Sequence, residues 1–254
     1  MYNINNKVFD KEMIHLIYVI SDLHGCYEEY IKMLNKINFN NNDTLYILGD
    51  ICDRGPEPMK ILLHMIEHEN IIPIYGNHDV MAYESLSKIG IYSKEVLKDR
   101  DYVVKNDLME YSEYRDFLYW LSDGGKRTLL DYDKLSISNK NKIINYLSDF
   151  YYYKELNINN IDYVLIHGGF NNFDPNKELF EYSLEELTNS RLDYNKKYYN
   201  NKIIISGHTP TKLIDINYTG KIIKRNNHIA IDCGCVFGYG LGCLCLDTME
   251  EYYV

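Results

Sequence analysis

Short apolar runs, each ended by a polar residue or a glycine, recur along the chain. They are rich in isoleucine and valine and nearly continuous in hydrophobicity, which is typical of strands buried on both faces of a sheet. The runs occupy residues 15–20, 44–48, 71–75, 162–166, 202–205 and 228–231. We therefore predict six buried strands at these positions.

The segments between the first runs carry apolar residues at helical spacing. In residues 27–37 the positions Tyr30, Ile31 and Leu34 fall on one side of a helix. Residues 56–69 open with prolines, which favour the first turn of a helix, and continue with helical spacing. Strands that alternate with helices predict an α/β layered domain.

Residues 82–160 have a mostly helical pattern, interrupted by the glycines of segment 123–125. We interpret this stretch as a helical cap inserted between the early and the late strands. Residues 229–254 place glycines between β-type residues, which predicts a hairpin that closes a sheet. No linker, internal repeat or low-complexity segment divides the chain, so we expect a single domain over residues 1–254 with the cap at about 82–160.

Composition and charge narrow the class of protein. With 254 residues and 46% hydrophobic residues, the chain is expected to bury a core and not to be disordered. The net charge of −10 argues against binding duplex nucleic acid through phosphate neutralisation. The longest apolar run near the start, residues 16–20, is too short for a membrane span, and no cleavage site follows it. Six dilute cysteines suit a reducing compartment, so we expect a soluble cytoplasmic protein with no membrane partner.

Polar residues that can bind a metal ion or take part in a reaction follow five of the predicted strands. The carboxyl ends of strands in an α/β sheet open into one crevice, so these residues are expected to converge. They are carboxylates, imidazoles and an amide, which suit Mn, Fe, Zn or Mg and not a cysteine-bound structural zinc. Any one of these loops alone would be an ordinary turn with a solvated histidine. Five in order are hard to obtain by chance. The loops are residues 22–25, 49–55, 76–79, 167–169 and 207–208.

This series resembles the phosphoprotein phosphatase (serine/threonine phosphatase) family, in its bacterial form, within the calcineurin-like metallophosphoesterases. The resemblance runs from about residue 16 to the C-terminal hairpin. It implies an α/β fold in which two mixed β-sheets pack as a sandwich flanked by helices, with a helical cap. It also implies two divalent metal ions, with Mn²⁺ favoured and Fe, Zn or Mg as alternatives.

The resemblance implies a role for each matching residue. Asp22 and His24 would bind one metal, Asp50 would bridge the two, and Asn77, His167 and His208 would bind the other. His78 would be the general acid for the leaving oxygen, with Asp53 orienting it. Arg54 would hold the phosphoryl oxygens, because a planar guanidinium makes paired hydrogen bonds to them.

Two further arginines match bacterial segments of the family less closely. Arg191 ends a segment that resembles a Leu-Trp-x-Arg motif, although Asn189 stands where the aromatic residue is usual. Segment 120–129 is similar to one that lies over the active site, so Gly124, Gly125 and Arg127 are candidates for substrate contact. The alternative for that segment is a helix cap and turn with a solvated Arg127.

The leading functional hypothesis is hydrolysis of phosphoserine or phosphothreonine on proteins, by in-line attack of a water held between the two ions. The alternative is hydrolysis of dinucleoside polyphosphates such as diadenosine tetraphosphate, and a more remote one is an inactive scaffold that binds phosphorylated partners. Asp53 favours the phosphatase branch, because the symmetrical tetraphosphatases usually have alanine there. Asp79, where eukaryotic protein phosphatases usually have glutamate, favours a bacterial branch of either kind.

The remaining cysteines, tyrosines and histidines are interpreted as structural. The group Cys233, Cys235, Cys243 and Cys245 is expected to be packing thiols. The clusters at 151–153 and 198–199 are expected to pack against neighbouring elements, and His64 and His68 to be surface residues. Cys26 and Cys52 lie beside metal-ligand candidates, so their oxidation is a hypothesis for loss of activity.

Overall fold

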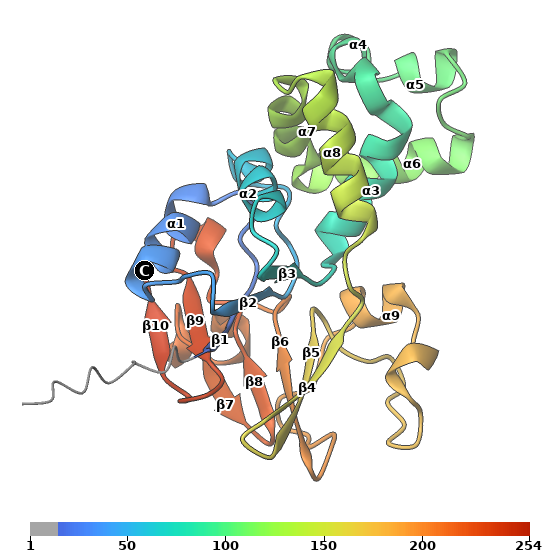
Figure 1. The fold of residues 1–254 in the computed structure, drawn as a ribbon. Coiled ribbons are helices and arrows are strands. Elements are labelled where there is room, and N and C mark those ends of the chain that lie inside the picture. The colour runs from blue at the N-terminus through green and yellow to red at the C-terminus, as the bar shows by residue number, and fades with distance from the viewer. Residues whose placement is uncertain (1–14) are drawn as a thin grey trace, which may run out of the picture.

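Two five-stranded mixed sheets stand at the centre of the computed structural model, which describes residues 15–254 (Figure 1). The first sheet has the order β10-β9-β1-β2-β3, with β1, β2 and β3 parallel and β9 antiparallel to β1. Its strands are β1 (Ile17–Ile20), β2 (Thr44–Ile47), β3 (Ile71–Pro73), β9 (Gly242–Cys245) and β10 (Glu251–Tyr253). Residues 1–14 of the predicted domain lie outside the described residues.

The second sheet has the order β4-β5-β6-β8-β7, with a parallel centre and two antiparallel edges. Its strands are β4 (Lys154–Ile158), β5 (Ile161–Ile166), β6 (Lys202–Ser206), β7 (Ile223–Arg225) and β8 (His228–Ala230). All six predicted strands are confirmed, as β1, β2, β3, β5, β6 and β8. The predicted C-terminal hairpin is also present, because β9 and β10 pair antiparallel at the edge beside β1.

Successive side chains of the central strands enter different cores. Val19 of β1 belongs to a cluster that also contains Leu165 and Ile205 of the second sheet, so this cluster lies between the sheets. Ile20, the next residue, belongs to the core on the other face, with α1 and α2. Ile166 of β5 faces a third cluster on the outer side of the second sheet. Burial on both faces explains why the buried positions of these strands form nearly continuous apolar runs.

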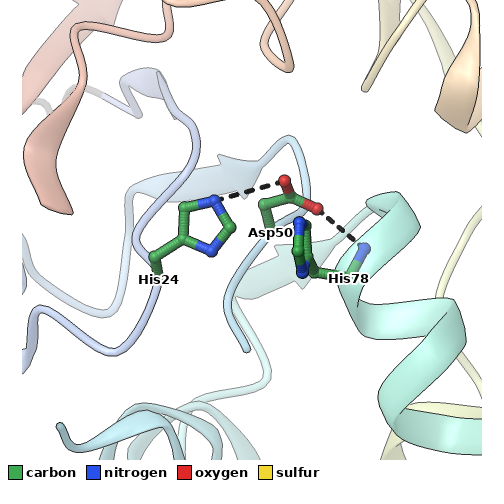
Figure 2. A group of neighbouring side chains, drawn as sticks. All are labelled: His24, Asp50 and His78. Atoms are coloured by element: carbon green, nitrogen blue, oxygen red, sulfur yellow. Dashed lines mark hydrogen bonds and ion pairs between the residues drawn. The ribbon is translucent and has the colours of Figure 1, made fainter. Parts of the chain in front are cut away.

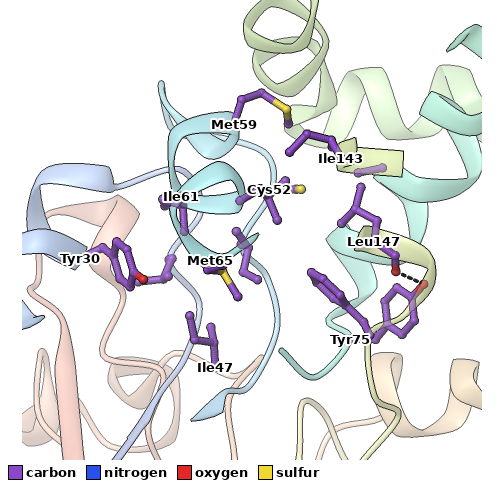
Figure 3. Packing of buried hydrophobic residues seen from close by; sticks show 14 of the residues in the cluster. Tyr30, Ile47, Cys52, Met59, Ile61, Met65, Tyr75, Ile143 and Leu147 are labelled. Atoms are coloured by element: carbon purple, nitrogen blue, oxygen red, sulfur yellow. Dashed lines mark hydrogen bonds between the residues drawn. The ribbon is translucent and has the colours of Figure 1, made fainter. Parts of the chain in front are cut away.

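Helices α1 (Tyr27–Lys36) and α2 (Pro58–Ile66) pack on the outer face of the first sheet. Figure 3 shows Ile61 and Met65 of α2 in the same core as Ile47 of β2, and Ile143 and Leu147 of the cap on the far side. The core of the first sheet therefore continues without interruption into the cap.

A lobe of helices forms the cap at one end of the sheets (Figure 1). It consists of α3 (Asn77–Ile89), η1 (Gly90–Tyr92), α4 (Ser93–Lys98), α5 (Tyr102–Lys105), α6 (Tyr111–Trp120), η2 (Leu121–Gly125), α7 (Lys126–Asp133) and α8 (Ile137–Ser148). Polar contacts also join the cap to the rest. For example, Asp131 accepts a hydrogen bond from the backbone N of Met59 (3.0 Å), and Tyr75 donates one to the carbonyl of Leu147 (2.5 Å).

Strand β4 lies within the range assigned to the cap from sequence. Its sequence alternates between half-buried and exposed positions and contains Lys154, Glu155 and Asn157, so it shows no apolar run. Among residues 15–254 its one pairing partner is β5, at the edge of the sheet. An edge strand needs no apolar side chain on its solvent face, and for this reason the hydrophobic pattern did not reveal it.

The later connections are short helical segments. They are η3 (Leu179–Glu181), α9 (Leu184–Asn189), α10 (Thr211–Ile214), η4 (Ile216–Tyr218) and η5 (Cys235–Phe237). Residues 198 and 199 pack on Phe170 and Phe173, as expected for structural tyrosines. Within residues 15–254, no helix combines the length and the apolar character that crossing a membrane requires.

Candidate functional site

Five loops at the carboxyl ends of parallel strands bring the predicted residues together where the two sheets meet. The backbone N of His208, after β6, donates hydrogen bonds to both carboxylate oxygens of Asp22, after β1 (3.2 and 3.1 Å). His167, after β5, bonds through Nδ1 to the carbonyl oxygen of Leu48 (2.6 Å). The predicted convergence is therefore confirmed, and it spans both sheets.

Asp50 is the centre of the group. Its Oδ2 lies 3.4 Å from Nε2 of His24, and its Oδ1 lies 3.4 Å from Nε2 of His167. Figure 2 shows His24 and His78 on two sides of this carboxylate, where the backbone N of His78 donates to Oδ1 (3.1 Å). The carboxylate therefore faces a different imidazole with each oxygen, as a bridging ligand requires.

The imidazoles are oriented for a cation. Nδ1 of His24 bonds to the carbonyl of Cys52 (2.8 Å), as Nδ1 of His167 does to that of Leu48. A ring that donates from Nδ1 presents a lone pair at Nε2, and two such lone pairs here face the oxygens of Asp50. Burial opposes a charged ring, yet Asp50 raises the pKa of His24 to about 9. The position beside Asp50 therefore attracts positive charge, which a metal ion held by these residues would supply.

The second half of the site contains Asn77, His167 and His208. Asn77 Oδ1 lies 3.2 Å from Nε2 of His167, and ligand atoms of Asp50, His167 and His208 lie within 4.8 Å of one another. Burial, with the neighbouring His167, lowers the pKa of His208 to about 3, so its ring is neutral and able to bind a metal. Two carboxylates, an amide and three imidazoles fit the oxygen and nitrogen preferences of Mn, Fe or Zn.

The first half differs in detail from the expectation. The ligand atoms that come within 4.8 Å of one another there belong to His24, Asp50 and His78. The Asp22 carboxylate is held by the backbone of His208 and by the hydroxyl of Ser21 (2.5 Å). The role of Asp22 as a metal ligand stays a prediction.

His78 and Asp53 form a buried pair. Nδ1 of His78 donates to Oδ2 of Asp53 (2.7 Å), and neither side chain is more than 1% exposed. Trp120 Nε1 donates to both oxygens of Asp53 (3.0 Å each), and the Thr128 hydroxyl donates to Oδ1 (2.6 Å). This carboxylate is fully buried, and the three donors hold it in one orientation.

Arg54 lies between the two imidazoles of the first half. Its Nη1 donates to Nε2 of His24 and its Nη2 to Nε2 of His78, each at 2.7 Å. Asp123 of the cap is 3.6 Å from Nη2 of Arg54 and 3.8 Å from Nε2 of His78. The guanidinium therefore bridges the Nε2 atoms of His24 and His78 on the side of the site that faces the cap.

The backbone at the site is in an uncommon conformation. Fourteen non-glycine residues in the described range have positive φ, and six of them are predicted site residues: Asp22, His24, Asp50, Asp53, Arg54 and His208. The other eight are six asparagines, Asp107 and Met249. Positive φ costs energy for residues with a Cβ and clusters at functional sites. Sharp turns at the strand ends therefore aim these side chains into the crevice.

Glycine is needed where these loops touch. A Cβ on Gly76 would lie 2.2 Å from Oδ1 of Asp50. A Cβ on Gly49 would lie 2.3 Å from the backbone N of Gly76 and 2.8 Å from Nδ1 of His167. The glycines beside the ligands thus serve close approach of the loops as well as turning of the chain.

The remaining arginine predictions have different outcomes. Arg191 lies beside the second half of the site, where its Nη1 donates to the carbonyl of His208 (3.1 Å) and to the hydroxyl of Thr209 (2.8 Å). Gly124 contacts Arg54 directly, because its carbonyl accepts from the Arg54 backbone N (3.3 Å). Arg127 is exposed on α7, and no hydrogen bond or ion pair within residues 15–254 joins it to the other candidates. Its contact with substrate stays a prediction.

The resemblance places segment 120–129 over the site, but it assigns no contact to Trp120, Asp123 or Thr128. These residues lie far from Asp53 and Arg54 in the chain, so the sequence gives no sign of the bonds between them. Asp232 is buried after β8, and burial together with Asp22 raises its pKa well above the usual range. It ends an apolar run as the other site residues do, and that signal could have found it.

Asp79 acquires a structural role. Its Oδ1 accepts from the backbone N of Ile51 and of Cys52 (3.0 Å each), and its Oδ2 accepts from that of Gly76 (3.1 Å). It thereby fixes the loop after β2 to the start of α3. Both Asp50 and His78 depend on that junction for their positions.

The cysteines are all free among the described residues. Cys233, Cys243 and Cys245 pack in the cores, as predicted. Cys235 is also buried in the core of the first sheet, as predicted, and it lies near Cys26 and Glu29, with ligand atoms within 4.8 Å. Cys52 is fully buried, and burial and Asp79 raise its pKa well above the usual range, which disfavours the reactive thiolate. The oxidation hypothesis is therefore confined to Cys26.

Replacing Thr128 by valine should loosen the buried Asp53. The Thr128 hydroxyl also accepts from the backbone N of Asp53 (2.8 Å), so valine leaves two buried polar groups without this partner. We expect the free energy of unfolding, measured in urea, to fall by about 2 kcal/mol. Thr128→Ser keeps the hydroxyl and should lose about 1 kcal/mol or less. Equal stability of the two variants would show that the hydroxyl does not hold Asp53.

Comparison with known proteins places these observations in context. A family model described as calcineurin-like phosphoesterase matches residues 15–225. A protein of Wigglesworthia glossinidia brevipalpis named symmetrical bis(5'-nucleosyl)-tetraphosphatase is 34% identical over 122 residues, which are 46% of this chain and 40% of the relative. Another of that name from Neisseria meningitidis is 37% identical over 106 residues, 41% of this chain and 36% of the relative. The matched segments thus span about two fifths of these relatives.

Solved structures agree on the fold. One described as a candidate diadenosine tetraphosphatase has a TM-score of 0.63 at 15% identity, covering 96% of this chain and 94% of that one. A protein serine/threonine phosphatase of Saccharomyces cerevisiae has a TM-score of 0.53 at 15% identity, covering 85% of this chain and 66% of that one. These likenesses, with the two mixed sheets and their flanking helices, confirm the predicted fold class.

Proposed function

Because the chain belongs to the calcineurin-like phosphoesterase family, we propose that it is a metal-dependent hydrolase of dinucleoside polyphosphates. The sequence alone favours protein phosphatase activity and leaves dinucleoside polyphosphate hydrolysis as the alternative hypothesis. The observation that carries the proposal is the similarity to relatives named symmetrical bis(5'-nucleosyl)-tetraphosphatase. Symmetrical cleavage of such a substrate releases two nucleoside diphosphates.

The geometry supports a hydrolytic role for the residues around Asp50. In the proposal Asp22, His24, Asp50, Asn77, His167 and His208 hold two divalent ions, with Mn²⁺ favoured. Bound there, the ions supply the activation of water and the neutralisation of phosphoryl charge. Arg54 and Arg191 bind phosphoryl oxygens from two sides. In the proposal Arg54, which bonds to Nε2 of His78 in this structure, turns to the phosphoryl oxygens, and the protonated His78 ring delivers a proton from Nε2 while Asp53 holds Nδ1.

Phosphoserine and phosphothreonine hydrolysis is the second candidate, and the Asp53–His78 pair favours it. An alkoxide is a poor leaving group unless it is protonated as its bond to phosphorus breaks. A buried carboxylate 2.7 Å from Nδ1 of the imidazole stabilises the charged ring that would donate this proton. The phosphate oxygen that leaves from a dinucleoside polyphosphate needs such help much less.

The deciding experiment compares two substrates with one preparation of manganese-loaded protein. Initial rates of nucleoside diphosphate release from diadenosine tetraphosphate are measured beside phosphate release from a phosphothreonine peptide, with Asp50→Asn as the inactive control. A higher kcat/KM on the dinucleotide supports the proposal. A higher value on the peptide makes the protein a phosphoprotein phosphatase. Metal binding without cleavage of either substrate would favour the phospho-binding scaffold.

A further inference from the structure

A groove of about 660 Å³ opens directly beside the second half of the candidate metal site. Helix α3 forms its base, with α6 of the cap on one side and α9 on the other. Asn77, the predicted metal ligand, lines one end. The groove is therefore continuous with the place where a phosphoryl group would react, and no step of the proposed chemistry uses it.

One face of α3 runs along the groove from Asn77. Val80, Met81 and Glu84 line it at the spacing i+3, i+4 and i+7, which keeps residues on the same side of a helix. Glu84 is seven residues from Asn77, about 10 Å along the helix axis. This distance suits a substrate that carries one further phosphate and then a ribose beyond the reacting phosphorus.

The lining is apolar below and acidic at the rim. Phe117 of α6 and Leu184 of α9 contribute apolar surface. Tyr119, at the end of α6, also lines the groove and is 61% exposed, which is unusual for a large aromatic side chain. A flat apolar group entering the groove would find this ring available for stacking.

The acidic rim restricts what the groove can accept. It includes Glu84, Glu113 and Asp116, and of these Glu113 is paired with Lys88 (2.7 Å). Burial, together with Asp116 and Glu113, raises the pKa of Glu84. No hydrogen bond or ion pair within residues 15–254 engages the Glu84 carboxylate. Such a rim repels phosphates and acidic peptides and accepts hydrogen-bond donors that carry no negative charge.

We propose that this groove binds one nucleoside of the substrate, with the base stacked on Tyr119 and the ribose hydroxyls donating to Glu84. The inference rests on the proposed function and adds the part of the site that distinguishes a nucleotide from a simple phosphoester. A nucleoside combines a flat aromatic base with two neighbouring hydroxyl donors and no charge. The apolar floor and the exposed Tyr119 ring suit the base, and the Glu84 carboxylate suits the two hydroxyl donors.

The test uses two tyrosines of the same helix. Tyr119→Ala should raise KM for diadenosine tetraphosphate about tenfold, because stacking of a base on an aromatic side chain is lost. Its kinetics with p-nitrophenyl phosphate, which has no nucleoside, should not change. Tyr111→Ala is the matched control, because Tyr111 is 83% exposed at the start of α6 and does not line the groove. Tyr119→Ala kinetics equal to those of Tyr111→Ala on both substrates would overturn the inference.

A second measurement separates this inference from the proposed function. ADP and its 2′,3′-dideoxy analogue are tested as competitive inhibitors of p-nitrophenyl phosphate hydrolysis, so no cleavage of a dinucleotide is needed. Removing the ribose hydroxyls should raise Ki about fivefold or more in the wild type and not in Glu84→Ala. If the dinucleotide is not cleaved but this coupling appears, the groove binds nucleosides and the proposed reaction is wrong. If the dinucleotide is cleaved and the coupling is absent, the reaction holds and the nucleoside site is wrong.

Discussion

Asp50→Asn is expected to remove both metal ions and to lower activity by roughly 10³-fold or more. Asp50 faces His24 with one oxygen and His167 with the other, each at 3.4 Å. Asparagine keeps one acceptor oxygen, puts an N–H₂ group in the place of the other, and carries no charge. One side of the site would then present a donor to a cation. The measurement is metal content per chain after manganese loading and gel filtration, together with kcat.

The controls for this variant separate the site from folding. Asp215→Asn changes a carboxylate of the same kind at η4, where it accepts a backbone hydrogen bond, and should retain both ions. Thermal unfolding establishes that Asp50→Asn is folded. Two ions per chain in folded Asp50→Asn would contradict the bridging role.

His78→Ala should retain its metal and lose activity in a way that depends on the leaving group. On a phosphothreonine peptide, removal of the proton donor is expected to lower kcat by about 10²–10⁴-fold. On diadenosine tetraphosphate the loss should be about tenfold or less, because the departing nucleoside diphosphate is a stable anion without a proton. The ratio of the two losses measures how far His78 acts as an acid and how far it holds Arg54, its partner at 2.7 Å.

Two controls accompany His78→Ala: its own metal content, and the activity of a variant at a histidine remote from the site. His68→Ala, just beyond α2, should match the wild type on both substrates, because among the described residues the His68 side chain bonds only to the carbonyl of His64 and stacks on its ring. Equal losses on the two substrates would contradict a role for His78 as a general acid. Loss of metal from His78→Ala to the extent seen in Asp50→Asn would make His78 a ligand, as its place in the cluster with His24 and Asp50 allows.

The site residues at strand ends can be predicted from sequence because the same arrangement of strands requires both the apolar run and the sharp turn after it that carries the polar residue. A parallel strand buried on both faces must be apolar, as β1 and β5 are, and its carboxyl end must turn sharply into the crevice. Asp50 and His167 follow such runs directly, so their convergence could be predicted. Asp232 also follows an apolar run, but no motif surrounds it that would point to a function.

The support around the site could not be predicted in the same way. Trp120 and Thr128 bond to Asp53 across 67 and 75 residues of chain, and that contact depends on how the cap packs on the first sheet. The groove is lined by three helices, and its shape follows from their packing. Strand β4 was hidden for a different reason, because at an edge its polar side chains face solvent.

The hydrogen bonds between the cap and the first sheet limit the routes by which molecules can reach the site. Lifting the cap would strip the buried Asp53 carboxylate of Trp120 and Thr128 and would break the contact between Asp131 and Met59. Each such loss in a buried setting costs about 1–3 kcal/mol, and together they make opening rare. We therefore expect the cap to stay closed on the sheets. Under the proposed function, substrate and product would pass along its edge between α6 and α9, without movement of the cap as a whole.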